Sequence, residues 1–167
     1  MKIFLVGLPG SGKSTFGKQL AEALQLPFID LDKEIEQACG MPVAEIFASK
    51  GEPWFREQES VTLRTIVGKD HSFVMATGGG TPCFHGSMEL MNQAGTTIFL
   101  DIPLNIIEQR ISEVEKSARP LFKSERSVSE KLQQLYEHRL PFYQQAVIHV
   151  NEPPLLNKVL AELLSKK

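Results

Sequence analysis

The sequence predicts an α/β fold in which helices cover both faces of a parallel β-sheet. Short apolar runs, typical of buried strands, alternate with longer segments of helical periodicity. A glycine-rich segment joins the first such strand to the first such helix, and no repeat, low-complexity tract or Gly/Ser-rich linker divides the chain. With 167 residues, the chain is long enough to bury one full core. We therefore expect a single domain over residues 1–167.

Strands and helices alternate from the beginning of the chain. Residues 3–6 form an apolar run expected to be a buried strand, and residues 15–24 follow as a helix with large apolar side chains on one face. Residues 28–29 are expected to be a second strand, which leads into two aspartates. A helix-rich stretch then covers residues 43–67, in which Pro53 is well placed to begin a second helix.

The second half of the chain continues the alternation. Further strands are expected at residues 73–76, 97–100 and 147–150. Helices are expected near residues 104–112, from 127 to about 141, and from 153 to 164. Ser127 with Glu130 three residues later is typical of a helix start, and Pro141 is predicted to end or kink that helix.

Composition excludes several classes of partner. Asp and Glu number 20 against 18 Lys and Arg, so no broad cationic surface for nucleic acid or an anionic membrane is expected. Cys39 and Cys83 fit neither a disulfide framework nor metal-ligand spacing. Residues 3–6 are too short an apolar run for a signal peptide or a membrane span. We expect a cytoplasmic protein with reduced thiols, monomeric because no hydrophobic surface stripe stands out.

Residues 7–14 read Gly-Leu-Pro-Gly-Ser-Gly-Lys-Ser and fit the phosphate-loop pattern G-x-x-x-x-G-K-[ST], between a strand and a helix. Glycines let the backbone wrap a phosphate, and the N–H groups and the helix dipole attract its charge. Lys13 is expected to reach the β- and γ-phosphates of ATP, and the Ser14 hydroxyl to ligate Mg²⁺. The nucleotide-binding residues predicted from this segment are Gly10, Ser11, Gly12, Lys13, Ser14 and Thr15.

The phosphate loop alone leaves kinase, GTPase and ATPase open. A GTPase is expected to carry Asn-Lys-x-Asp, but Asn157-Lys158 is followed by Val-Leu. No strand ends in the usual metal-binding aspartate, so a carboxylate from elsewhere must help to hold the metal. Asp30 and Asp32 follow the second strand, and both point to the same side if the chain stays extended. One suits Mg²⁺ and the other suits a base for an attacking hydroxyl, which favours an alcohol acceptor.

Five short motifs follow the phosphate loop in the order and approximate spacing of one family. They are Asp30-Leu31-Asp32, Phe55-Arg56 with Glu59, Gly78-Gly79-Gly80, Arg119-Pro120-Leu121 and Arg139-x-Pro141-x-Tyr143. With them, the chain resembles the shikimate kinase family over nearly its whole length. The resemblance implies a P-loop fold like that of nucleoside monophosphate kinases, with five parallel strands in the order 2-3-1-4-5. It also implies a substrate-binding region at about residues 31–60 and a lid at about residues 113–125.

The same resemblance implies MgATP-dependent phosphorylation of the 3-hydroxyl of shikimate, on the route to aromatic amino acids. It implies that Asp32 binds the substrate hydroxyls and acts as the base, and that Asp30 helps to hold Mg²⁺ through water. Arg56 and Arg139 are implied to pair with the shikimate carboxylate, with Glu59 orienting Arg56. The remaining implied roles are substrate binding by Gly78, Gly79 and Gly80, phosphate contact by the lid residue Arg119, and adenine or phosphate contact by Arg110.

Two other interpretations remain open on the residues. A gluconate-type or other small-molecule kinase shares the phosphate loop and the fold, although the glycine triplet with Arg-Pro-Leu favours shikimate. A non-catalytic nucleotide-binding module is the second, and it has no need for a base or for an arginine that contacts the transferred phosphate. Lys13, Ser14, Asp30, Asp32 and Arg119 argue against it.

Overall fold

A computed structural model describes residues 1–114, 128–152 and 156–165. Five strands form one parallel sheet in the order β2-β3-β1-β4-β5, which confirms the predicted fold class and strand order. The strands are β1 (Lys2–Val6), β2 (Phe28–Asp30), β3 (Phe73–Ala76), β4 (Thr96–Leu100) and β5 (Ile148–Val150). Each lies within one residue of its predicted bounds, and the inner strands β1, β3 and β4 contain compact apolar runs that the two faces of the sheet bury.

Eight helices and one 3₁₀ turn are described between and after these strands. They are α1 (Lys13–Leu24), α2 (Leu31–Cys39), α3 (Val43–Lys50), α4 (Glu52–Val67), η1 (Thr81–Cys83), α5 (Ser87–Ala94), α6 (Leu104–Val114), α7 (Val128–Tyr143) and α8 (Leu156–Ser165). Pro53 lies in the first turn of α4, as predicted. The helix α5 was not predicted, since its two turns carry only a short apolar pattern around Met88 and Met91.

The end of one predicted helix differs from expectation, and the starts of two predicted helices lie outside the described residues. Helix α7 passes through Pro141 and ends at Tyr143, and the Gln144 N–H still donates a 2.9 Å bond to the Leu140 carbonyl. The proline removes only its own N–H, so the turn around it persists. Ser127 of the predicted capping box and the predicted start of the last helix at 153–154 lie outside the described residues.

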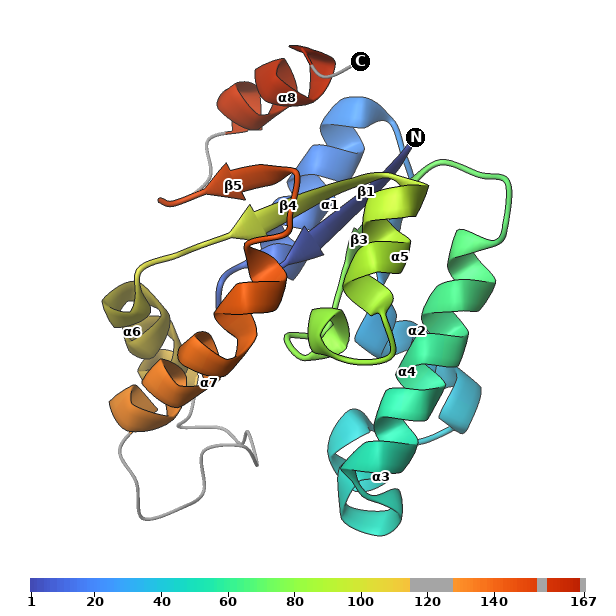
Figure 1. Cartoon of the computed structure of the whole chain (residues 1–167), viewed down its shortest axis with the longest axis vertical. Helices are drawn as coiled ribbons and strands as arrows, with labels where there is room; N and C mark the ends of the chain where they lie inside the picture. Colours follow the sequence, from blue (N-terminus) through green and yellow to red (C-terminus); the bar gives the residue numbers. More distant parts are fainter. Residues whose placement is uncertain (115–127, 153–155, 166–167) are drawn as a thin grey trace.

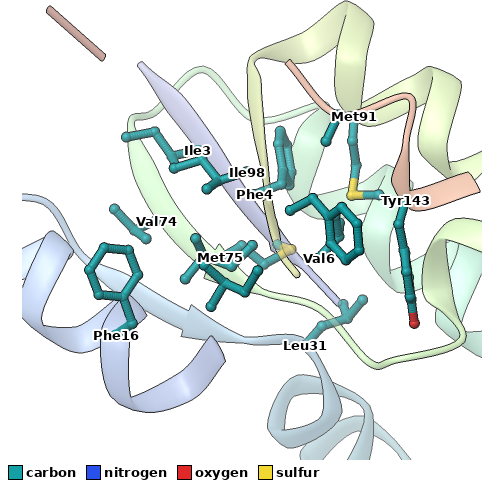
Figure 2. Close-up of a cluster of buried hydrophobic side chains, with 14 of the residues drawn as sticks. Ile3, Phe4, Val6, Phe16, Leu31, Val74, Met75, Met91, Ile98 and Tyr143 are labelled. Carbon is teal, nitrogen blue, oxygen red and sulfur yellow. The ribbon is translucent and has the colours of Figure 1, made fainter. Parts of the chain in front are cut away.

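The sheet is a central layer with helices on both faces (Figure 1), where α1 lies behind the strands and α5 and α7 lie in front of them. Residues 3–6 of β1 are fully buried, as expected for the middle strand of such a sheet. In Figure 2, Phe16 of α1 lies on one side of these strands, with Met91 of α5 and Tyr143 of α7 on the other. No helix in the described part of the chain is long and apolar enough to cross a membrane.

The topology brings three of the sequence motifs to one edge of the sheet. Parallel strands share a carboxyl edge, and β2, β3 and β1 are direct neighbours. The segments that follow them are the aspartate pair, the glycine triplet and the phosphate loop. Helices α2, α3 and the first part of α4, which include the predicted substrate-binding region 31–60, are grouped beyond this edge (Figure 1).

Candidate active site

The phosphate loop adopts the backbone that its glycines permit. Gly10 and Gly12 have φ angles of +83° and +94°, which strain any other residue, and α1 begins directly after them at Lys13. The buried Lys13 ammonium donates bonds of 2.9 and 2.8 Å to the Gly7 and Leu8 carbonyls, so it lies across the loop. Such a loop at a helix N-terminus is built to hold an anion.

Three more predicted nucleotide-binding residues lie in this loop or next to it. The Ser11 hydroxyl is buried and has no hydrogen-bond partner in the described part of the chain, as expected of a group that serves a ligand. Thr15 lies exposed in the first turn of α1. Arg110 donates a 3.2 Å bond from Nη1 to the Gly10 carbonyl, which brings its charge to the phosphate loop. Of the two roles considered for Arg110, this geometry favours phosphate contact.

Ser14 and Asp30 form a pair of hard oxygen ligands. The Ser14 hydroxyl donates a 2.9 Å bond to Oδ2 of Asp30, at the end of β2. Among the described residues no group of three or more His, Cys, Asp or Glu side chains could hold a metal ion. The pair therefore fits Mg²⁺, which keeps several water ligands and takes others from nucleotide phosphates, rather than a metal held in an all-protein cage.

The path of the chain at Asp30 corrects one step of the sequence argument. The expectation that both aspartates point the same way assumed extended backbone, but the strand ends at Asp30 and α2 begins at Leu31. The buried Leu31 side chain anchors that helix start in the core. Asp32 therefore lies in the first turn of α2, directed at the glycine triplet. The two carboxylates still belong to one site. They are placed there by the start of helix α2 directly after the strand, and not by the alternation of side chains along a strand.

The environment of Asp32 suits a proton acceptor. Burial, then the negative charges of Glu59 and Asp30, raise the pKa of Asp32 to about 6, while the Lys13 ammonium lowers it. A carboxyl group with this pKa is mostly ionised at neutral pH and accepts a proton more readily than an ordinary aspartate. Its Oδ1 is 3.0 Å from the position that a Cβ at Gly78 would occupy.

The glycine triplet after β3 is a surface of bare backbone. A Cβ at Gly79 would lie 2.9 Å from Nη1 of Arg139 and 2.8 Å from Cδ of Pro9, and a Cβ at Gly80 would lie within the Arg56 guanidinium. Thr77 holds the segment next to the phosphate loop, because its hydroxyl donates a 3.0 Å bond to the Leu5 carbonyl of β1. The triplet thus adjoins the phosphate loop and two arginines, and side chains there would displace them.

Arg56 is held rigidly before any ligand binds. The buried guanidinium donates bonds of 3.0 Å to Glu52 and 2.9 Å to Glu59. It also lies near three aromatic rings, of which Phe84 is nearest at 4.6 Å and belongs to the loop after η1. Glu59 was predicted to orient Arg56, and this geometry agrees. The contribution of Glu52 was not predicted, although Glu52 lies four residues before Arg56, at the spacing of a helical ion pair. The contribution of Phe84 was not predicted either, and no pattern in the sequence connects it to Arg56.

Arg139 approaches the same triplet from helix α7. Its Nη1 is buried and has no hydrogen-bond partner within the described ranges. A buried N–H donor left without a partner is costly, and such groups commonly serve ligands. The structure therefore brings Asp32, Arg56 and Arg139 together around the glycine triplet, next to the phosphate loop. Arg119 and the lid from residue 115 onward lie outside the described residues.

Comparison with protein-family models shows which family has this site. A model of the shikimate kinase family matches residues 9–166 of the chain. The chain belongs to the shikimate kinase family. It is accordingly an ATP-dependent kinase, as the phosphate loop and its surroundings predicted.

Individual shikimate kinases resemble the chain over most of their length. The enzyme of Bacteroides fragilis is 44% identical over 148 residues, which cover 87% of this chain and 82% of that protein. A crystal structure of shikimate kinase from Bacteroides thetaiotaomicron has a TM-score of 0.89 and 36% identity, covering 99% of this chain and 98% of that one. The shikimate kinase from Acinetobacter baumannii in complex with shikimate also has a TM-score of 0.89, at 34% identity, covering 99% and 94%.

Two hydroxyl groups at the shikimate kinase site escaped the sequence argument. Thr81, fully buried, donates a 2.5 Å bond to Oε1 of Glu59 and so fixes the carboxylate that holds Arg56. Tyr143 donates a 2.5 Å bond to the Gly79 carbonyl. Tyr143 was quoted only as part of a motif. The one signal for its role was its position four residues, or one helical turn, after Arg139.

Proposed function

We propose that this kinase transfers the γ-phosphate of MgATP to the 3-hydroxyl of shikimate, giving shikimate 3-phosphate and ADP for aromatic amino-acid biosynthesis. The observation that carries the proposal is the convergence of Arg56 and Arg139 on the glycine triplet, beside Asp32. Such a site offers bare backbone, two guanidiniums and one base. It suits a small, compact acid that carries hydroxyl groups.

The acceptor's carboxylate is assigned to the two arginines. A guanidinium makes two parallel bonds to a carboxylate, which a lysine cannot reproduce. Nη1 of Arg139, which has no hydrogen-bond partner among the described residues, gives one such donor, and Arg56 is already oriented by Glu52 and Glu59. Because these groups are fixed in advance, little side-chain entropy is lost when the acid binds. The glycine triplet lets the ring of the acceptor lie against the backbone.

The reacting hydroxyl is assigned to Asp32. With a pKa of about 6, its carboxylate can accept the hydroxyl proton as the oxygen attacks phosphorus. Gly79 of the triplet lies against Pro9 of the phosphate loop. An acceptor bound on the triplet is therefore next to the ATP phosphates, so its attacking oxygen can reach the terminal phosphate. Alignment of the two groups, rather than covalent chemistry by the protein, supplies most of the acceleration in phosphoryl transfer.

The phosphate side is assigned to the loop and its cations. The backbone N–H groups and Lys13 bind the phosphates of ATP, and Arg110 adds charge beside Gly10. Ser14 and Asp30 are the residues that would hold Mg²⁺, partly through water, and the ion would neutralise charge on the phosphates. Arg119 is proposed, from its sequence motif alone, to contact the transferred phosphate.

Several finer assignments complete the proposal. We propose that residues 1–167 are one kinase domain, with a lid at about residues 113–125 that excludes water during transfer. We also propose that the protein works as a monomer in the cytoplasm, without nucleic acid or membrane partners. The near balance of 20 acidic and 18 basic side chains supports the absence of nucleic acid and anionic membrane partners.

Phosphorus NMR of the reaction products tests the proposal. Protein incubated with ATP, magnesium and shikimate should give ADP and a single phosphomonoester coupled to the proton on carbon 3 of the ring. A phosphomonoester on another hydroxyl would contradict the assigned acceptor geometry. ATP binding without any new phosphomonoester would instead support a non-catalytic nucleotide-binding module.

A further inference from the structure

Tyr143 connects the hydrophobic core to the glycine triplet. It is fully buried, and its ring packs on Phe99 of β4 with centroids 5.0 Å apart. Figure 2 shows the ring at the edge of the buried cluster, with the hydroxyl directed away from the apolar side chains. That hydroxyl donates a 2.5 Å bond to the carbonyl oxygen of Gly79. Packing therefore fixes the ring, and the ring fixes the position of the donor.

The hydroxyl also lies next to a second group of the site. Burial raises the pKa of Tyr143 well above its ordinary value, and the positive charge of the Arg139 guanidinium offsets only part of this rise. The phenol therefore keeps its proton. The hydroxyl thus remains a donor to the Gly79 carbonyl.

Fixing the Gly79 carbonyl determines the direction of the next N–H. A trans peptide unit is planar, so its carbonyl and N–H point in opposite directions. The bond from Tyr143 therefore directs the Gly80 N–H away from the Tyr143 hydroxyl, and the Arg56 guanidinium also lies close to Gly80. Neither the Gly79 nor the Gly80 N–H donates to a backbone carbonyl in the parts of the chain that are described.

We propose that Tyr143 is a positioning residue for the acceptor, acting through its hydroxyl on the Gly79–Gly80 peptide. The Gly80 N–H then donates to the bound acid, on the same side as Arg56. This inference rests on the proposed function, because the acid is shikimate. A residue needed only to fill the core would require the ring and not the hydroxyl, since phenylalanine fills the same space.

The variant Tyr143→Phe separates these two roles. The ring stays on Phe99, but the bond to the Gly79 carbonyl is lost. Loss of a neutral hydrogen bond should raise the KM for shikimate about 3- to 10-fold, with the KM for ATP unchanged. Tyr136→Phe is the matched control, because it removes a tyrosine hydroxyl from the same helix whose 3.1 Å bond goes to Asp101. Its KM for shikimate should equal that of the unchanged protein.

A second measurement does not depend on the folding of any variant. In unchanged protein labelled with ¹⁵N-glycine, titration with shikimate should move the amide resonance of Gly80. A Gly80 resonance that does not respond to saturating shikimate would overturn the proposal. An equal KM for shikimate in Tyr143→Phe and the unchanged protein, or an equal rise in both KM values, would also overturn it. If the unchanged protein has no shikimate-dependent turnover, the proposed function and this inference fail together.

Discussion

Arg56 donates a 2.9 Å hydrogen bond from Nη1 to Oε2 of Glu59, and both side chains are almost fully buried. The pair spans the glycine triplet, because Glu59 lies beside Gly78 and Arg56 beside Gly80. Glu59 also contributes to the raised pKa of Asp32. One carboxylate therefore orients the arginine assigned to the acceptor and influences the aspartate assigned as base.

The variant Glu59→Gln should reduce both stability and acceptor binding. Removing one partner of a buried ion pair leaves Arg56 with Glu52 alone and should lower the free energy of unfolding by about 3 kcal/mol. Urea unfolding measures this. Glu52→Gln is the control, because the Glu52 side chain is 52% exposed and should cost less than about 1 kcal/mol. Equal losses in the two variants would show that Glu59 has no special part in holding Arg56.

The variant Arg139→Lys should raise the KM for shikimate about 10- to 100-fold while the KM for ATP stays the same. A lysine keeps the charge but loses the planar pair of donors that a carboxylate needs. Arg64→Lys is the control, since Arg64 donates to the His85 carbonyl at the surface and should tolerate the change. Steady-state kinetics with each substrate varied in turn measures both constants. Unchanged acceptor kinetics in Arg139→Lys would remove Arg139 from the site.

The variant Asp32→Asn should lower kcat about 10²- to 10⁴-fold and leave ATP affinity nearly intact, because it removes only the base. It should also stabilise the protein at pH 7. The folded-state pKa of about 6 lies above the ordinary aspartate value of 3.8, so this carboxyl group costs stability as pH rises through that range. The asparagine avoids this cost, which amounts to about 1 to 3 kcal/mol. Asp70→Asn, at an exposed position after α4, should change neither quantity. A variant that keeps its turnover would deny Asp32 the role of base.

The pH dependence of kcat/KM for shikimate should have an acidic limb near pH 6, where Asp32 becomes protonated. Below that pH, the constant should fall about tenfold per unit. In Glu59→Gln the limb should move to lower pH, because one of the negative charges that raise the Asp32 pKa is gone. Rates measured from pH 4.5 to 8.5 test this. A limb at the same pH in both proteins would mean that another group controls it.

Local patterns were enough to predict most of the fold. The strands β1, β3 and β4 contain runs of large apolar residues, and burial of residues 3–6 on both faces explains why such runs become central strands. The helix α5 was missed because two buried methionines in two turns are a weak periodic signal. The argument for the direction of Asp32 assumed extended backbone through residue 32, but the strand ends at Asp30 and α2 begins at Leu31, whose side chain enters the core.

The site was less accessible to sequence reasoning because its contacts join distant segments. The phosphate loop is continuous, so its residues could be assigned from one motif. Arg56 and Arg139 lie on different helices, and only the family resemblance placed them together in advance. The bonds from Thr81 to Glu59 and from Tyr143 to Gly79 depend on tertiary packing, for which the sequence holds no periodic signal.

The most direct test of the central claim is ADP release from MgATP, with shikimate, gluconate and no added acceptor compared in parallel. The arginine pair, the glycine triplet and Asp32 predict fast release with shikimate and only background rates in the other two samples. Release that is independent of the acceptor, or faster with gluconate than with shikimate, would contradict the assignment of this site.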